Sequence, residues 1–225
     1  ISLTVVSEIV VHRTTAQTLL TSSEQTLEQI RYTTELLFGE LDSLNLAFST
    51  NFEISSTLKR IVRTEKLDLD DFNAVDTIQS FISAPTNARP HILSIYVYIA
   101  NASQRLLTTS EGLTTVSSFP DSEWYERYVT ADTDRTMWSE TRTLREYRSQ
   151  RAQPRVLTLY RAIEIPGSMR RDGVIVLNVP ITTLEEMLDS LKRSPLQNLV
   201  IINENGDVLA STSLTQNADA IRFAD

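Results

Sequence analysis

The long N-terminal stretch without proline is the feature that most constrains this chain. Residues 1–84 contain no proline and a single glycine, so nothing there interrupts a long helix. Apolar and small residues recur in alternating steps of four and three: Ala16, Leu20, Ser23, Leu27, Ile30, Thr34, Leu37, Leu41, Leu44 and Phe48. This heptad-like seam predicts a helix of about 45 residues, about 65–70 Å long. A compact domain needs no such length, so we expect part of it to project as a stalk or to pack along a second module. A helix bundle is the alternative, and the different pattern downstream argues against it.

A second helical stretch is expected before the strands begin. The helical pattern continues through Ile61, and the acidic segment LDLDD then begins another helix. We expect Asp68 or Asp70 to cap that helix, and Pro85 and Pro90 to end it. LDLDD lacks the turn glycine and the distal glutamate of an EF-hand, so helix capping explains it better than calcium binding does.

From Ile92 onward the apolar pattern changes to a period of two, which is typical of a strand. Tyr96 and Tyr98 point to one face, and the turn NASQ leads into a partner strand. A short helix in FPDSEWYERYV follows, then the strands TMWSETRTL, RVLTLYRAIEI and GVIVLNV, and a helix in ITTLEEMLDSLKR with Thr183 as its expected N-cap. This order predicts an α+β domain with one antiparallel sheet of about five strands.

The chain repeats one pattern about a hundred residues apart. Residues 93–110, LSIYVYIANASQRLLTTS, and residues 199–212, LVIINENGDVLAST, both contain an apolar run, a turn that opens on Asn, a second apolar pair and a small hydroxyl tail. The repeat therefore predicts two strand–turn–strand units in tandem, the second of which is followed by only a few of the given residues.

Composition excludes several classes of function. The net charge of −8 argues against binding to nucleic acid, and no apolar run approaches the roughly 18 residues of a membrane-spanning helix. Cysteine is absent, which excludes thiol nucleophiles and thiolate metal sites. The two histidines, His12 and His91, are isolated from each other, and no glycine-rich phosphate loop or nucleophile elbow occurs. We therefore expect no enzyme activity, no cofactor and no metal site.

Aromatic residues give the clearest indication of a binding site. In the predicted topology the first hairpin, the short helix and one face of the sheet enclose a single concavity. A small pocket there would have apolar faces and polar tips. Its expected lining is Tyr96, Tyr98, Trp124, Tyr125, Trp138, Tyr160 and Asn178. The alternative is that these large side chains simply form the core.

Several of these segments, taken in order, resemble a known family. The long helix, SIYVYIANASQRLLTTSEG, DSEWYERY, DGVIVLNVPITTLEEML and the second hairpin NENGDVLAS look like a double Cache sensor domain. Such domains are extracytoplasmic parts of bacterial histidine kinases, chemoreceptors and membrane-tethered AraC-type regulators. The SIYVY…TTS and Trp-Tyr pattern is particularly similar to Gram-positive sugar-responsive receptors. The resemblance implies a stalk helix over 1–60, a membrane-distal PAS-like domain over 61–194 and the beginning of a membrane-proximal module over 195–225.

The resemblance also implies a ligand class. Family members that bind amino acids carry Arg two residues before the Trp-Tyr pair and Asp on the last strand. Here Trp124 and Tyr125 match, but Ser122 and Asn178 stand at those two positions. Without these charges an α-amino acid lacks its two ionic partners, and a sugar or another uncharged polar molecule fits better.

The partners implied are a small molecule or an extracellular solute-binding protein, bound by a receptor that dimerises and is anchored through flanking membrane helices outside these residues. The alternative is a structural or protein-interaction module without a small-molecule ligand.

Overall fold

The computed structural model describes residues 2–64, 66–131, 137–145, 153–163, 172–193, 198–202 and 208–212, and excludes the side chains of residues 2–20, 49, 137 and 138. The chain divides into two compact units. One comprises Glu40–Leu184, and the other comprises Ile1–Gly39 together with Glu185–Asp225. The domain boundaries expected from the sequence remain predictions.

The long helix is present, although it does not run as far as predicted. Helix α1 spans Ser2–Thr50, 49 residues, and a separate helix α2 spans Phe52–Arg63. The predicted continuation through Ile61 as one helix is wrong because Asn51 interrupts it. Asn51 adopts an extended backbone, and its side chain accepts a 3.1 Å hydrogen bond from the backbone N–H of Ile54, which makes it the N-cap of α2.

The predicted cap of the next helix is confirmed, and its predicted end is confirmed at Pro90 but wrong at Pro85. Helix α3 spans Leu69–Ala88, and Asp68 caps it through a 2.8 Å hydrogen bond from the backbone N–H of Asp71. Pro85 lies inside α3 and is buried. Pro85 cannot donate an intrahelical hydrogen bond, and the helix nevertheless continues to Ala88, with Arg89 as its C-cap directly before Pro90.

The seam predicted along α1 is buried only in part. In the larger unit Leu41 and Phe48 are buried, at 0% and 5% exposure. In the smaller unit Ser23 is exposed and Leu27 is 62% exposed, so the predicted seam is not buried at these two positions. The side chains of Ala16 and Leu20 lie outside the described residues.

The larger unit contains the predicted antiparallel sheet, with six strands. They are β1 (Ser94–Ile99), β2 (Arg105–Thr108), β3 (Gly112–Thr115), β4 (Met137–Thr143), β5 (Arg155–Ile163) and β6 (Gly173–Pro180). Their order across the sheet is β3-β2-β1-β6-β5-β4, and all pairs are antiparallel. The sequence prediction missed β3 because this short edge strand, GLTT, has no alternating apolar pattern.

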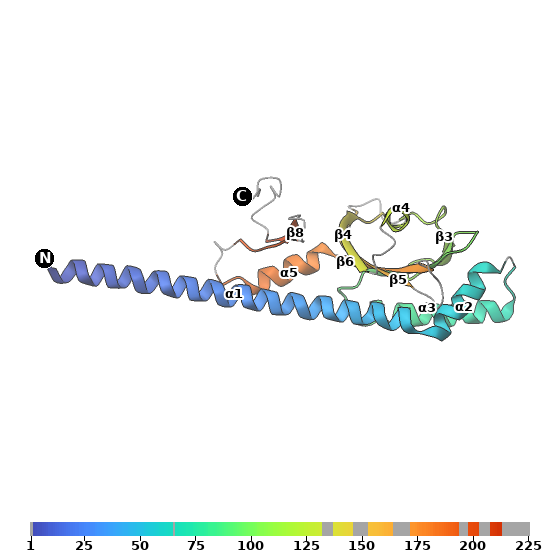
Figure 1. Ribbon diagram of the computed structural model, residues 1–225, viewed down its shortest axis with the longest axis horizontal. Helices are drawn as coiled ribbons and strands as arrows, with labels where there is room; N and C mark the ends of the chain where they lie inside the picture. The colour runs from blue at the N-terminus through green and yellow to red at the C-terminus, as the bar shows by residue number, and fades with distance from the viewer. Residues whose placement is uncertain are drawn as a thin grey trace. The chain divides into compact units, whose positions relative to one another are not determined.

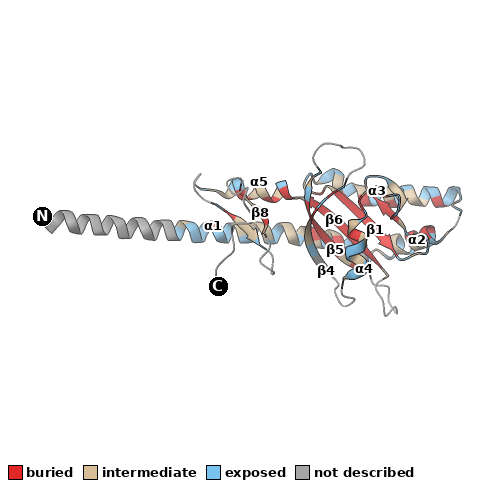
Figure 2. Cartoon of the chain, turned by 90° about the horizontal axis from the view of Figure 1, so that it is seen from above, coloured by how far each residue is buried: buried red, intermediate tan, exposed pale blue. Residues whose placement is uncertain are grey.

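Helices cover both faces of the sheet in this unit. Figure 1 shows α4 (Glu123–Thr130) on one side of the sheet and α2 and α3 on the other. Every residue of β1 is therefore buried, and Figure 2 shows that buried residues dominate β1, β5 and β6. At Gly173 the strands β6 and β1 lie so close that an added Cβ would stand 2.1 Å from the carbonyl oxygen of Tyr98, which accounts for glycine at this position.

The smaller unit contains the second hairpin that the repeat predicted. Strands β7 (Val200–Ile202) and β8 (Val208–Ser211) pair antiparallel, and the predicted turn between them lies outside the described residues.

Helix α5 (Ile181–Leu191) begins two residues before Thr183, so the predicted N-cap at Thr183 is wrong and this residue lies in the first helical turn.

Candidate functional site

Strand register brings together three polar side chains that are far apart in the sequence. Asn178 on β6 lies opposite Ser94 on β1 and also opposite Thr158 on β5. All three residues are nearly fully buried. The Asn178 amide donates a 2.9 Å hydrogen bond to the Ser94 hydroxyl, and its carbonyl oxygen accepts a 2.8 Å hydrogen bond from the Thr158 hydroxyl. A polar row therefore crosses the centre of the sheet.

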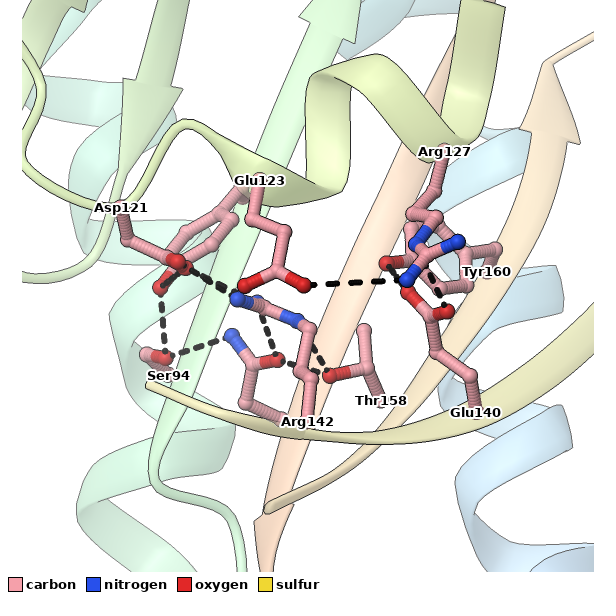
Figure 3. A network of polar contacts seen from close by, with 10 residues as sticks. Ser94, Asp121, Glu123, Arg127, Glu140, Arg142, Thr158 and Tyr160 are labelled. Atoms are coloured by element: carbon pink, nitrogen blue, oxygen red, sulfur yellow. Dashed lines mark hydrogen bonds and ion pairs between the residues drawn. The ribbon is translucent and has the colours of Figure 1, made fainter. Parts of the chain in front are cut away.

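An ion pair lies directly above this row. Arg142 on β4 and Asp121, which precedes α4, have side chains that are only 2% and 1% exposed. The Nη1 and Nη2 atoms of Arg142 donate to the two carboxylate oxygens of Asp121 at 2.5 and 2.8 Å, and Nη2 also donates to Asn178 at 3.0 Å. The Nε atom donates to Thr158 at 2.9 Å. Figure 3 shows these side chains as one network.

Tyr96 completes the network from β1. Its hydroxyl donates a 2.9 Å hydrogen bond to the Asp121 carboxylate and lies 3.4 Å from the Ser94 hydroxyl. Burial raises the pKa of Tyr96, and the negative charge of Asp121 raises it further, so the phenol stays protonated and donates. Burial alone would lower the pKa of Arg142, but the hydrogen bond and charge of Asp121 outweigh it and raise that pKa. The buried charges therefore balance.

The aromatic residues predicted to line a pocket gather between the sheet and α4. Tyr96, Tyr98, Trp124 and Tyr160 are at most 3% exposed and belong to one apolar cluster, against which Tyr125 packs. The rings of Tyr98 and Trp124 lie 5.9 Å apart, and those of Tyr98 and Tyr125 lie 5.4 Å apart. These side chains contact one another closely. Their role in binding a ligand remains a prediction.

Two tryptophans complete the description of the predicted site. Trp138 lies on β4 opposite Tyr160, and its side chain is outside the described residues. The indole N–H of Trp124 is buried, and it has no hydrogen-bond partner within the described part of the chain. An unsatisfied buried donor costs about 1–3 kcal/mol.

A second polar group lies between α4 and the sheet. The hydroxyl of Tyr160 donates a 2.5 Å hydrogen bond to Glu140 on β4, and burial together with this bond raises the pKa of Tyr160. Arg127 on α4 contacts the same carboxylate at 3.2 Å and Glu123 at 3.8 Å (Figure 3). Because Arg127 is half exposed, these ion pairs contribute little to stability.

An open pocket of about 300 Å³ adjoins the buried network. Its wall carries hydroxyl side chains from α3, β1 and the turn after β2, together with one residue of each charge, Glu111 and Arg145. The hydroxyl residues are Thr86, Ser94, Tyr96, Thr109 and Ser110. Phe119, Pro120 and Leu144 contribute apolar surface. The pocket thus combines neutral polar groups with apolar walls, which is the usual composition of a small-molecule site.

The pocket and the network share residues. Ser94 and Tyr96 belong to both, Pro120 is the chain neighbour of Asp121, and Leu144 follows Arg142 by two residues. A molecule in the pocket therefore contacts the segments that carry both members of the ion pair.

Sequence reasoning missed Arg142 and Asp121. Ser122 carries no guanidinium at the position where the resemblance implies Arg in amino-acid-binding members, whereas the structure supplies one from β4. The alternation of β4 contained the signal, since Trp138, Glu140 and Arg142 are spaced by two and share one face of the strand. Nothing local pairs Asp121 with Arg142, because the two are separated by 21 residues.

The residues that the structure describes contain neither a membrane-spanning helix nor a cluster of metal-ligating side chains. None of the helices there combines the length and the apolar composition needed to cross a bilayer. Within those ranges no three His, Cys, Asp or Glu side chains gather in a way that suits a metal ion.

No protein-family model and no curated protein sequence matches this chain. Solved structures do match. The extracellular domain described as that of the histidine kinase vpHK1S-Z8 is 14% identical, covers 90% of this chain and 72% of its own, and gives a TM-score of 0.55. The sensory domain of the Campylobacter jejuni chemoreceptor Tlp3 with isoleucine bound is 15% identical, covers 86% and 71%, and gives 0.52. The periplasmic sensory domain of Campylobacter jejuni Tlp1 is 15% identical, covers 84% and 70%, and also gives 0.52. The chain therefore has the fold of bacterial receptor sensory domains, which confirms the predicted double Cache-like fold.

Proposed function

We propose that this chain is the extracytoplasmic ligand-sensing part of a bacterial transmembrane signalling receptor, and that it passes its signal through the long helix α1. The observation that carries the proposal is the open pocket of about 300 Å³ beside the buried network, in a fold shared with receptor sensory domains. No catalytic step is assigned to this segment. In the full-length receptor we expect a homodimer anchored through flanking membrane helices.

The chemistry of the pocket supports an uncharged polar ligand, and a sugar-like molecule better than an amino acid. Several hydroxyl groups line the wall, and its two charged residues, Glu111 and Arg145, are exposed to solvent, which screens their charges. In the adjoining network the guanidinium of Arg142 is bound by Asp121, and Asn178 provides an amide rather than a carboxylate. Neither ionic partner of an α-amino acid is free in that network.

The aromatic residues are the proposed wall on the side of α4. Tyr96 lines the pocket, and the indole N–H of Trp124, which has no partner among the described residues, is a donor that we propose a hydroxylated ligand would satisfy. We propose that Tyr98, Tyr125, Trp138, Tyr160 and Asn178 surround the same site.

A second candidate is a protein-docking module without a small-molecule ligand, with an extracellular solute-binding protein as its partner. One observation favours it. Tyr98 and Trp124 are already packed against each other between α4 and the sheet, which is the arrangement of a core.

A thermal-shift screen with sugars, polyols, amino acids and organic acids distinguishes these candidates. A ligand that binds only the folded state raises the melting temperature with its concentration. We expect an uncharged polyhydroxyl compound to give this shift, and Ser110→Trp, which fills the pocket from an exposed turn, to abolish it. Ser103→Trp, on the exposed turn between β1 and β2 and away from the pocket, is the matched control and should retain the shift. If no compound shifts the melting temperature, or if Ser110→Trp retains the shift, the docking module becomes the better account.

A further inference from the structure

We infer that Arg142 is the centre of a carboxylate-binding site whose anion is supplied by the chain itself, as Asp121. Asp121 is thus a specificity-determining residue that excludes ligand carboxylates from the sensor. The effect on ligand choice rests on the proposed sensing function, whereas the site itself does not.

The contacts around Asp121 are those of a complete anion site. Its carboxylate accepts two parallel hydrogen bonds from Arg142, at 2.5 and 2.8 Å, and a third from the Tyr96 hydroxyl at 2.9 Å. Paired donation from a guanidinium is the geometry that recognises carboxylates most specifically. The side chains of Arg142 and Asp121 are 2% and 1% exposed, so water does not compete for these bonds.

The receiving part of the site is held by the sheet. Arg142 lies on β4, and its guanidinium is oriented by Thr158 on β5 and Asn178 on β6, while Tyr96 lies on β1. The carboxylate comes from outside the sheet, since Asp121 lies in the segment between β3 and α4 (Figure 3). The hydrogen-bond donors thus belong to the sheet, whereas the accepting carboxylate lies on a connecting segment outside it. The carboxylate therefore occupies the position that the carboxylate of a separate ligand would occupy.

This arrangement determines which charge the sensor accepts. A ligand carboxylate would have to displace a carboxylate of the same chain that is already in position and needs no loss of translational freedom to bind. The open pocket beside Tyr96 and Pro120 is then left for the uncharged part of a ligand. Wild-type protein should therefore not respond to small carboxylates.

Removal of the internal carboxylate tests the inference directly. Asp121→Ala removes a group of about the size of formate. We expect sodium formate and sodium acetate at neutral pH to raise the melting temperature of Asp121→Ala with the logarithm of their concentration. Sodium chloride at equal ionic strength and formamide, the neutral analogue of formate, should give no such rise. Wild-type protein and Asp121→Ala/Arg142→Met should show no difference between formate and chloride.

Three outcomes overturn the inference: formate has no greater effect on Asp121→Ala than chloride, formate stabilises the double variant equally, or formate stabilises the wild type equally. If Asp121→Ala does not fold in chloride, its refolding in formate is measured instead, by circular dichroism. The inference is also overturned if Asp121→Ala fails to refold at every formate concentration while the double variant folds. Because no natural ligand is used, these results are independent of the screen for the sensed compound.

Discussion

At the scale of single residues, the buried pair of Arg142 and Asp121 is the feature on which the site depends. Two opposite charges buried together cost desolvation energy, and their mutual attraction and hydrogen bonds offset that cost. The neutral partners Tyr96, Thr158 and Asn178 add hydrogen bonds to the two charged groups, so each member depends on the others.

Arg142→Met should therefore be strongly destabilising, because it leaves the Asp121 carboxylate buried without its cation. We expect a loss of about 3–5 kcal/mol in the free energy of unfolding, measured by urea denaturation. Asp121→Asn combined with Arg142→Met leaves no unpaired charge and should recover most of the loss. A cost below about 1 kcal/mol for Arg142→Met would mean that the pair is not sequestered from water.

At the scale of elements, the packing of α1 differs along its length. Leu41 and Leu27 belong to one predicted seam on one helix, yet Leu41 is fully buried in the larger unit and Leu27 is 62% exposed. The heptad spacing describes which residues share a face, and it does not say where a sheet or helix covers that face.

Leu41→Ala and Leu27→Ala form a matched pair that measures this difference. Leu41→Ala creates a cavity and should cost about 2–5 kcal/mol in the free energy of unfolding. Leu27→Ala, the same change at an exposed position, should stay within about 0.5 kcal/mol. Chemical denaturation of both variants at one protein concentration checks this, and equal losses would place Leu27 in a packed interface.

At the scale of the whole molecule, buried phenols set the alkaline limit of stability. Burial raises the pKa of Tyr96, Tyr98 and Tyr160 in the folded state. A raised folded-state pKa means that the folded protein holds its proton where the unfolded chain, with a tyrosine pKa of about 10, has lost it. This contribution to stability is complete below about pH 10 and is lost as the pH rises further.

We therefore expect the free energy of unfolding to decrease steadily above about pH 10, with a smaller slope in Tyr160→Phe than in wild type. Urea denaturation across the alkaline range gives the slopes. Tyr32→Phe, at a position that is 60% exposed, controls for the loss of a surface phenol. An unchanged slope in Tyr160→Phe would show that this residue does not hold its proton in the folded state.

The sequence by itself determined the features that depend on interactions between residues close together in the chain. The absence of proline predicts α1, Asp68 caps α3 because its side chain reaches a backbone N–H three residues away, and the period of two places Tyr96 and Tyr98 on one face of β1. The predictions that failed, at Asn51, Pro85 and Thr183, concern element ends, where a single hydrogen bond or the burial of a proline changes the outcome.

Only the tertiary structure decided the candidate site. Arg142 and Asn178 are 36 residues apart, and the strand order β6-β5-β4 brings their side chains together. Asp121, 21 residues before Arg142, reaches them from the segment between β3 and α4. Nothing within a few residues of Arg142 indicates that its charge is neutralised inside the protein. That outcome depends on burial and on pairing across the sheet, which are properties of the folded chain and not of any local segment.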